Sequence, residues 1–194
     1  MSKKIMKIIE HVRTIEGWLT NKEILGLVIM TMLAERIPGS IVEIGSYKGK
    51  STLALAMSSL RLTKAKKTVY AIDPFSSNGI IGKNYYKAFR KNMKNAGVKQ
   101  YVVPIKRLSH EAYNDFPVPI AQLFIDGNHE YDMVKQDISI YVPKVSQGGY
   151  IAFHDYNQSK FPGVKHAVDE LLQNKKYQVI GDFDSLRIVM KSNI

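Results

Sequence analysis

The amino-acid sequence predicts a single α/β domain with a doubly wound, seven-stranded and mostly parallel sheet. Its 194 residues and 45% hydrophobic content suit one well-formed core, and no linker or internal repeat divides the chain. Short apolar segments alternate with amphipathic segments along most of its length. Because strands that alternate with helices form parallel βαβ units, helices are expected on both faces of the sheet.

Two helices are expected before the first strand. The second begins with Thr20 and Glu23, which have the spacing of a capping box, and its apolar residues recur at helical spacing. We therefore divide the chain into an N-terminal helical cap, residues 1–38, and a core that carries the sheet, residues 39–194.

The elements follow in order from the apolar pattern. The expected strands are 40–44, 68–72, 101–105, 121–125, 150–153, 177–181 and 186–191. The expected helices are 3–16, 20–36, 50–62, 83–96, 109–115, 131–141 and 163–174. Pro104 is an awkward occupant of the third strand, because proline cannot donate to a strand ladder. The connection between the last two strands is short enough for an antiparallel hairpin at one edge of the sheet.

The composition limits the kinds of protein and of site to consider. The chain contains no cysteine, which excludes disulfides, a thiolate nucleophile and cysteine-based metal sites. A reducing, cytoplasmic environment fits this composition. The basic start of the chain lacks the apolar core of a signal peptide, and the longest apolar stretch, residues 24–34, is too short to span a bilayer.

The net charge of +11 is concentrated in one segment. Residues 61–107 hold 12 of the 28 lysines and arginines but only one acid, Asp73, whereas the rest of the chain is neutral. A solvated surface that aids solubility is the favoured interpretation. Steering of an anionic substrate, or contact with nucleic acid or acidic lipid, stays open, although no RNA-binding signature accompanies the segment.

A glycine loop follows the first strand, in the run Glu43-Ile44-Gly45-Ser46-Tyr47-Lys48-Gly49-Lys50-Ser51. Gly45 allows a sharp turn, and Gly49 opens the next helix and allows close approach of a ligand. Ser51 lies in the first helical turn, where free N–H groups favour a carboxylate. The glycine spacing matches neither a P-loop nor a dinucleotide fingerprint. Glu43 suits a cationic ligand better than a phosphate.

Acidic and histidine side chains follow three later strands. Asp73 ends the second strand, where an acid suits the hydroxyls of a ribose. Asp126 follows the fourth strand, and His154 and Asp155 follow the fifth, so neighbouring parallel strands would bring them to one edge of the sheet. Oxygen and imidazole ligands with an open position suit a divalent cation. His129, close behind Asp126, is placed to accept a proton from a hydroxyl.

With these motifs together, the chain resembles the class I methyltransferases, which have a Rossmann-like fold. Within that class it is similar to metal-dependent small-molecule O-methyltransferases: catechol O-methyltransferase and, more closely, macrolide-sugar O-methyltransferases and their cephalosporin-hydroxylase-like relatives. The matching segments are Glu43–Ser51, Ile72–Phe75, Ser109, Ile125–Tyr131 and Gly148–Tyr156.

The resemblance implies S-adenosylmethionine as the cofactor. The loop from Gly45 to Tyr47 would line its methionine moiety, Ser51 would hold the carboxylate, and Asp73 would hold the ribose. Ser109 and His110 would lie by the adenine. The full set of expected cofactor-binding residues is Glu43, Gly45, Ser46, Tyr47, Gly49, Ser51, Asp73, Ser109, His110 and Asp126.

The resemblance also implies a divalent cation, Mg²⁺ or Mn²⁺, bound by Asp126, His154 and Asp155. Asp126 would bridge cofactor and metal, and His129 matches the position of the catalytic general base. The relatives usually have a carboxylate where His154 stands, and a site with two aspartates and one histidine leans toward Mn²⁺ or Fe²⁺. The predicted reaction is metal-assisted O-methylation of a small-molecule hydroxyl.

Alternatives from other classes stay open at this point. An RNA-directed methyltransferase would use the basic face of residues 61–107, and a metal-dependent hydroxylase would share the scaffold. A homo-oligomer also stays open, because the N-terminal helices are expected either to cover the acceptor pocket or to form a subunit contact. Trp18 is expected to serve packing.

Overall fold

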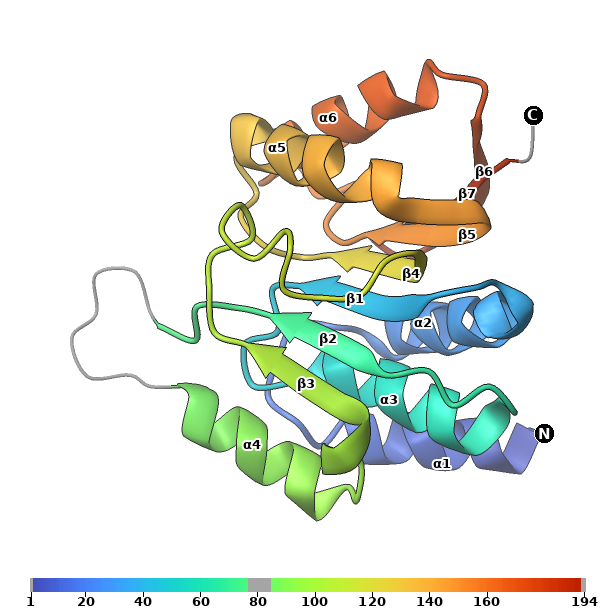
Figure 1. Cartoon of the computed structure of the whole chain (residues 1–194), viewed down its shortest axis with the longest axis vertical. Coiled ribbons are helices and arrows are strands. Elements are labelled where there is room, and N and C mark those ends of the chain that lie inside the picture. Colours follow the sequence, from blue (N-terminus) through green and yellow to red (C-terminus); the bar gives the residue numbers. More distant parts are fainter. Residues whose placement is uncertain (1, 77–84, 193–194) are drawn as a thin grey trace.

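The computed structural model describes residues 2–76 and 85–192 (Figure 1). Its strands form one seven-stranded sheet in the order β3-β2-β1-β4-β5-β7-β6. They are β1 (Ser40–Ile44), β2 (Val69–Ile72), β3 (Val102–Ile105), β4 (Ile120–Ile125), β5 (Val145–Phe153), β6 (Tyr177–Phe183) and β7 (Leu186–Lys191). Pairs among β1 to β5 are parallel, whereas β7 is antiparallel to both β5 and β6. The predicted sheet, with its antiparallel hairpin at one edge, is confirmed.

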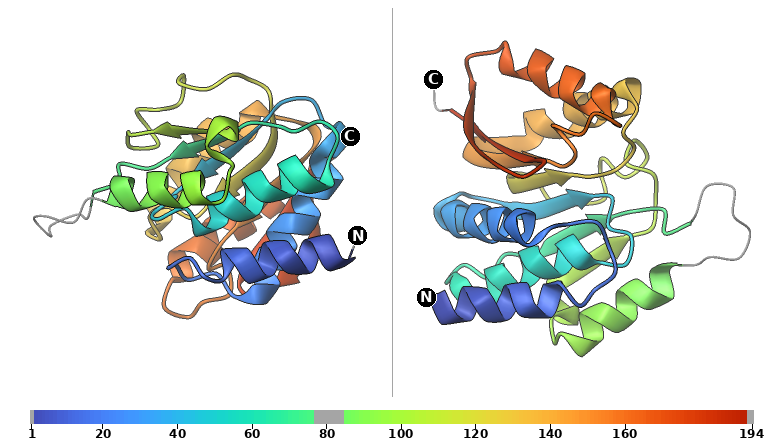
Figure 2. Two further views of the ribbon diagram at one scale, coloured as in Figure 1. Left: turned by 90° about the horizontal axis from the view of Figure 1, so that it is seen from below. Right: turned by 180° about the vertical axis from the view of Figure 1, so that it is seen from behind.

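Helices cover both faces of this sheet (Figure 2). They are α1 (Ser2–Val12), α2 (Asn21–Leu33), α3 (Lys50–Leu62), α4 (Tyr85–Asn95), α5 (Tyr131–Tyr141) and α6 (Pro162–Leu172). α1 to α4 pack on one face, with sheet residues such as Ile41 and Phe124. α5 and α6 pack on the other face, with Val42 and Leu123. Successive strand residues thus serve opposite cores, which explains why every residue of β1 and β4 is buried.

One predicted helix is absent from the structure, and the start of another falls outside the described residues. The predicted fourth helix began at residue 83, and residues 83 and 84 lie outside the described residues. No helix forms over 109–115. The amide of Ala112 bonds to the carbonyl oxygen of Leu108 at 3.1 Å, but this turn does not propagate. Pro117 lacks an N–H, and the Asn-Asp pair before it favours turns over helix.

The position of β3 explains the proline inside it. β3 is an edge strand that pairs with β2, where Pro104 lies opposite Ala71. An edge strand leaves one side of its backbone unpaired, so the missing N–H of Pro104 removes no essential ladder bond.

The N-terminal helices belong to the main hydrophobic core. Ile8, Val12, Ile24 and Leu27 are fully buried, and their cluster includes residues of α3 and of the sheet. The link between α1 and α2, together with the first turn of α2, reaches the strand ends. None of the helices in residues 2–76 and 85–192 has the length and apolar character needed to cross a bilayer.

The strand order reverses between β1 and β4. After β1 the chain runs outward through β2 and β3, and it then returns to β4 on the other side of β1. In open α/β sheets, ligands bind beyond the carboxyl ends of the strands at such a switch point. The fold therefore directs attention to the residues that follow β1 and β4.

Candidate active site

A pocket of about 910 Å³ lies beyond the carboxyl ends of β1, β2, β4 and β5. Ile44 pairs with Ile72 and with Ile125, and Ile125 pairs with Phe153, so these strands end at one level. The residue that follows each strand lines the same space. These residues are Gly45, Asp73, Asp126 and His154. The structure thus brings together the candidate residues that the sequence placed after four different strands.

The Asp73 carboxylate fixes the shape of the glycine loop. Its Oδ2 accepts hydrogen bonds from the backbone amides of Ser46 and Tyr47, both at 2.8 Å. Its Oδ1 accepts a further bond from the amide of Phe75. A carboxylate that ties the end of β2 to the loop after β1 orders one wall of the pocket.

The two glycines of the loop have different tasks. Gly45 has a φ of 84°, and a Cβ there would lie 2.0 Å from the backbone oxygen of Asp126, so only glycine fits between the ends of β1 and β4. Gly49 has a φ of 88°, and a Cβ there would lie 2.4 Å from Met93 and 2.9 Å from Phe89. Gly49 therefore packs against α4 and is not among the residues that line the pocket, and its contact with the cofactor stays a prediction.

Glu43 also lies outside the pocket lining, because it is fully buried beneath the loop. Its carboxylate accepts hydrogen bonds from the hydroxyls of Ser46, at 2.8 Å, and Thr52. Burial raises the pKa of Glu43 to about 7, although these two hydroxyls and that of Ser51 act in the opposite direction. Glu43 supports Ser46 from beneath the loop, and its contact with the cofactor stays a prediction.

The start of α3 forms the next part of the wall. Ser51 lines the pocket in the first turn of this helix, as predicted. Sequence reasoning missed Lys50, which also lines the pocket and whose Nζ donates a 3.0 Å hydrogen bond to the carbonyl oxygen of Gly17. This bond ties the link between α1 and α2 to the helix start, a contact that no local pattern encodes.

Ser109 and His110 also line the pocket, in the segment that forms turns instead of a helix. The Tyr141 hydroxyl holds this segment by donating a 2.6 Å hydrogen bond to the carbonyl oxygen of Ser109. Asp137 of α5, which sequence reasoning missed, also lines the pocket. Burial raises the pKa of Asp137 to about 6, against a lowering contribution from Ser109.

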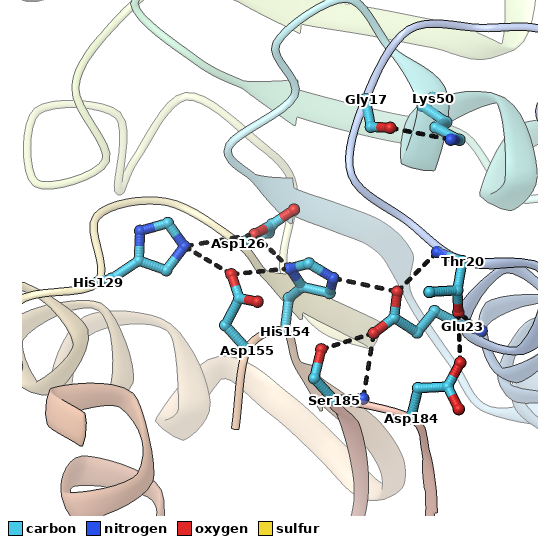
Figure 3. Close-up of polar contacts among 10 residues, drawn as sticks. All are labelled: Gly17, Thr20, Glu23, Lys50, Asp126, His129, His154, Asp155, Asp184 and Ser185. Carbon is cyan, nitrogen blue, oxygen red and sulfur yellow. Dashed lines mark hydrogen bonds and ion pairs between the residues drawn. The ribbon is translucent and has the colours of Figure 1, made fainter. Parts of the chain in front are cut away.

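The acidic and histidine cluster lines the pocket where β4 and β5 end (Figure 3). His154 Nδ1 lies 3.0 Å from Asp126 Oδ1 and 3.1 Å from Asp155 Oδ2. His129 Nε2 lies 2.9 Å from the same Asp155 oxygen and 3.9 Å from Asp126 Oδ1. The His129 ring stacks on Phe161, with centroids 4.1 Å apart, which holds its orientation. All four predicted residues therefore meet at one point.

Glu23 is a fifth member of the cluster that sequence reasoning assigned only to helix capping. Its Oε2 lies 3.3 Å from His154 Nε2, so both ring nitrogens of His154 face carboxylates. Burial alone would lower the pKa of His154, but Asp126, Asp155 and Glu23 outweigh it and raise the pKa to about 12. Burial would raise the pKa of Glu23, yet contacts with His154 and others lower it to about 2.

These residues fit a divalent cation. Ligand atoms of Asp126, His154 and Asp155 lie within 4.8 Å of one another. Neighbouring ligands of an octahedral ion with bonds of about 2.1 Å lie about 3 Å apart, which is the spacing of His154 Nδ1 from both aspartate oxygens. Three carboxylates around one imidazole, counting Glu23, also give the site an excess of negative charge.

Comparison with known proteins identifies the family. Residues 42–156, more than half of the chain, match the family described as a methyltransferase domain. The chain belongs to this methyltransferase family. A relative, the uncharacterized protein R132 of Acanthamoeba polyphaga mimivirus, is 30% identical over 167 residues, which cover 79% of this chain and 72% of that protein. The S-adenosylmethionine-dependent methyltransferase class predicted from the sequence is thereby confirmed.

Solved structures share the fold of this methyltransferase. The O-methyltransferase NovP superposes with a TM-score of 0.69 at 20% identity, covering 89% of this chain and 81% of NovP. The O-methyltransferase TomG from Streptomyces achromogenes, involved in tomaymycin synthesis and solved with S-adenosylmethionine, gives 0.69 at 13% identity, covering 98% and 90%. At these identities the likeness concerns the fold.

Trp18 stands at the mouth of the methyltransferase pocket, so its expected role in packing is wrong. Its side chain is 77% exposed and lines the pocket. Its ring centroid lies 5.1 Å from that of Tyr47, which in turn lies 4.5 Å from that of Tyr85. Three aromatic rings from separate elements therefore form one side of the entrance.

The basic segment of the methyltransferase contributes to an outer surface and to the pocket. Among its described residues, several side chains of α4 are exposed: Lys87, Arg90, Lys91 and Lys94. Arg107 lines the pocket near Ser109 and forms a 3.3 Å ion pair with Asp115. The segment thus places a cationic side chain at the site itself.

Proposed function

We propose that this methyltransferase transfers the methyl group of S-adenosylmethionine to a hydroxyl of a small molecule, assisted by a divalent cation such as Mg²⁺ or Mn²⁺. The observation that carries the proposal is the meeting of Asp126, His129, His154 and Asp155 in the pocket that the ordered glycine loop also lines. The names of NovP and TomG as O-methyltransferases support a hydroxyl acceptor.

The donor would lie along the switch point between β1 and β4. The methionine part would face the loop at Ser46 and the helix start at Ser51, where free N–H groups favour a carboxylate. The ribose would lie by Asp73 and the adenine by Ser109 and His110. This arrangement would direct the sulfonium methyl toward Asp126 and the cluster beside it.

Asp126, His154 and Asp155 would hold the cation, which when bound lowers the pKa of a hydroxyl that contacts it. His129 would take up the hydroxyl proton, and the Asp155 carboxylate, whose Oδ2 lies 2.9 Å from His129 Nε2, would stabilise the resulting imidazolium. The oxygen attacks the methyl carbon in line as the carbon–sulfur bond breaks, releasing S-adenosylhomocysteine. The chain contributes mainly the positioning of donor and acceptor.

The experiment is a turnover assay that follows S-adenosylhomocysteine release with a panel of catechols and sugars, in the presence of Mn²⁺. We expect His129→Ala to lower kcat by about 10²- to 10⁴-fold, the range of general acid–base catalysis, while S-adenosylhomocysteine still binds. Full turnover by His129→Ala on an accepted substrate would show that another group takes the proton.

A further inference from the structure

Glu23 brings the N-terminal helices into the centre of the site. It lies in the first turn of α2, only 2% exposed, yet its carboxylate reaches His154 at the end of β5 (Figure 3). Asp126 and Asp155 approach His154 from its Nδ1 side, and Glu23 approaches from its Nε2 side at 3.3 Å. The imidazole ring therefore has carboxylates on both sides: two face Nδ1 and one faces Nε2.

The Glu23 carboxylate is itself fixed by neighbours from two elements. Its Oε1 accepts hydrogen bonds from the backbone amide of Ser185, at 3.1 Å, and from the Ser185 hydroxyl, at 2.6 Å. Its Oε2 accepts one from the backbone amide of Thr20, at 2.8 Å, as part of the capping box. A carboxylate with these three donors cannot turn away, so its approach to His154 Nε2 is built into the fold.

The consequence for His154 follows from imidazole chemistry. A neutral imidazole carries one N–H and one lone pair, and the partner of one nitrogen decides the state of the other. Without a cation, Asp126 and Asp155 lie closer to Nδ1, at 3.0 and 3.1 Å, than Glu23 lies to Nε2, at 3.3 Å. When a cation occupies the space between the two aspartates, Nδ1 must supply a lone pair, and the remaining N–H then faces the Glu23 carboxylate. An imidazole that donates to a carboxylate is also a stronger metal ligand.

We infer that Glu23 is a positioning residue of the cation site: its carboxylate, 3.3 Å from His154 Nε2, favours a proton on that nitrogen when a cation is bound and so leaves Nδ1 of His154 as the nitrogen that ligates. This inference rests on the cation of the proposed function. It gives the N-terminal segment a role that packing alone does not supply, since an acid from α2 completes a site otherwise built by β4 and β5.

The test is Mn²⁺ affinity, measured by titration with electron paramagnetic resonance detection of free Mn²⁺, for wild type, Glu23→Gln and Thr20→Ala. Glutamine also suits the third position of a capping box, so Glu23→Gln keeps the helix start but removes the charge. Thr20→Ala is the matched control, because it loses the side-chain cap that accepts from the Glu23 amide and leaves the Glu23 carboxylate intact.

We expect Glu23→Gln to weaken Mn²⁺ binding by about 10- to 100-fold, as loss of a ligand's hydrogen-bond partner does in other sites, and Thr20→Ala to stay within about twofold of wild type. As a second readout, long-range ¹H–¹⁵N spectra of Zn²⁺-loaded wild type should show His154 protonated at Nε2 and bound at Nδ1.

Three results would overturn the inference. Equal Mn²⁺ affinity of wild type and Glu23→Gln would remove the role of Glu23 and leave the metal-assisted reaction standing. A proton on His154 Nδ1 of the Zn²⁺-loaded protein would show that Nδ1 does not bind the ion, contrary to the inference. No Mn²⁺ binding by folded wild type would remove the cation itself, and with it both the inference and the metal part of the proposed function.

Discussion

The Ser46 hydroxyl donates a 2.8 Å hydrogen bond to the buried carboxylate of Glu43, directly beneath the glycine loop. Ser46 lines the pocket and Glu43 does not, so the pair connects the wall of the site to the core of the sheet. The same carboxylate accepts from the hydroxyl of Thr52 in α3. Glu43 thus joins the loop to the helix that follows it.

Glu43 should make the stability of the protein depend on pH. Burial raises its pKa from 4.5 to about 7, so between these values the folded protein holds a proton that the unfolded chain has released. Stability must then fall as pH rises through this window. In urea unfolding between pH 5 and 8, we expect wild type to lose about 2 to 3 kcal/mol more than Glu43→Gln. Glu10→Gln, on the exposed side of α1, is the control and should follow wild type. Parallel profiles for wild type and Glu43→Gln would contradict the account.

Binding of a cation should displace a proton from His154. Burial lowers the pKa of this histidine, but Asp126 and the other carboxylates around it prevail and raise the value to about 12, so the metal-free imidazole is protonated near neutral pH. A metal ligand must be neutral, so binding releases the proton and affinity increases with pH, by about tenfold per unit for one proton. Calorimetry of Mn²⁺ binding in two buffers of different ionisation enthalpy should yield close to one proton per ion. Binding without proton release would exclude His154 from the ligands.

Trp18 should report occupancy of the pocket. It is the only tryptophan in the chain, and its exposed ring lines the entrance beside Tyr47. A donor bound along the glycine loop should displace water from this ring, and we expect S-adenosylhomocysteine to shift tryptophan emission to shorter wavelength. Trp18→Phe keeps an aromatic ring but loses the signal, which makes it the control. Unchanged emission at a concentration that saturates the protein by calorimetry would place the ligand away from Trp18.

The sequence predicts most of this architecture because its signals are local. Apolar runs, the turn at Gly45 and the acids after β2, β4 and β5 each depend on neighbours in the chain, and parallel pairing then brings the strand ends together. The seven strands and the meeting of Asp126 with His154 follow from these patterns.

The parts that the sequence does not predict depend on distant packing. The sequence identifies Glu23 only as a helix-capping residue. Its contact with His154 depends on the packing of α2 near Ser185, which lies 162 positions away in the chain. From the sequence, Trp18 is expected to serve packing, because no local sequence pattern indicates that the segment between α1 and α2 borders a pocket. Gly49 and Glu43 both belong to the loop motif, yet neither lines the pocket. Gly49 packs against α4, and Glu43 is buried because β1 is a central strand of the sheet.

The central claim is that the glycine loop and Asp73 form the S-adenosylmethionine site. The most direct measurement is calorimetric titration of S-adenosylhomocysteine into wild type, Asp73→Ala and Asp132→Ala, the last an exposed acid of α5 that does not line the pocket. We predict micromolar binding to wild type and to Asp132→Ala, and loss of binding in Asp73→Ala, because the loop amides of Ser46 and Tyr47 lose their anchor. Far-ultraviolet circular dichroism would confirm that each protein is folded. No binding by folded wild type, or equal binding by all three proteins, would contradict the account.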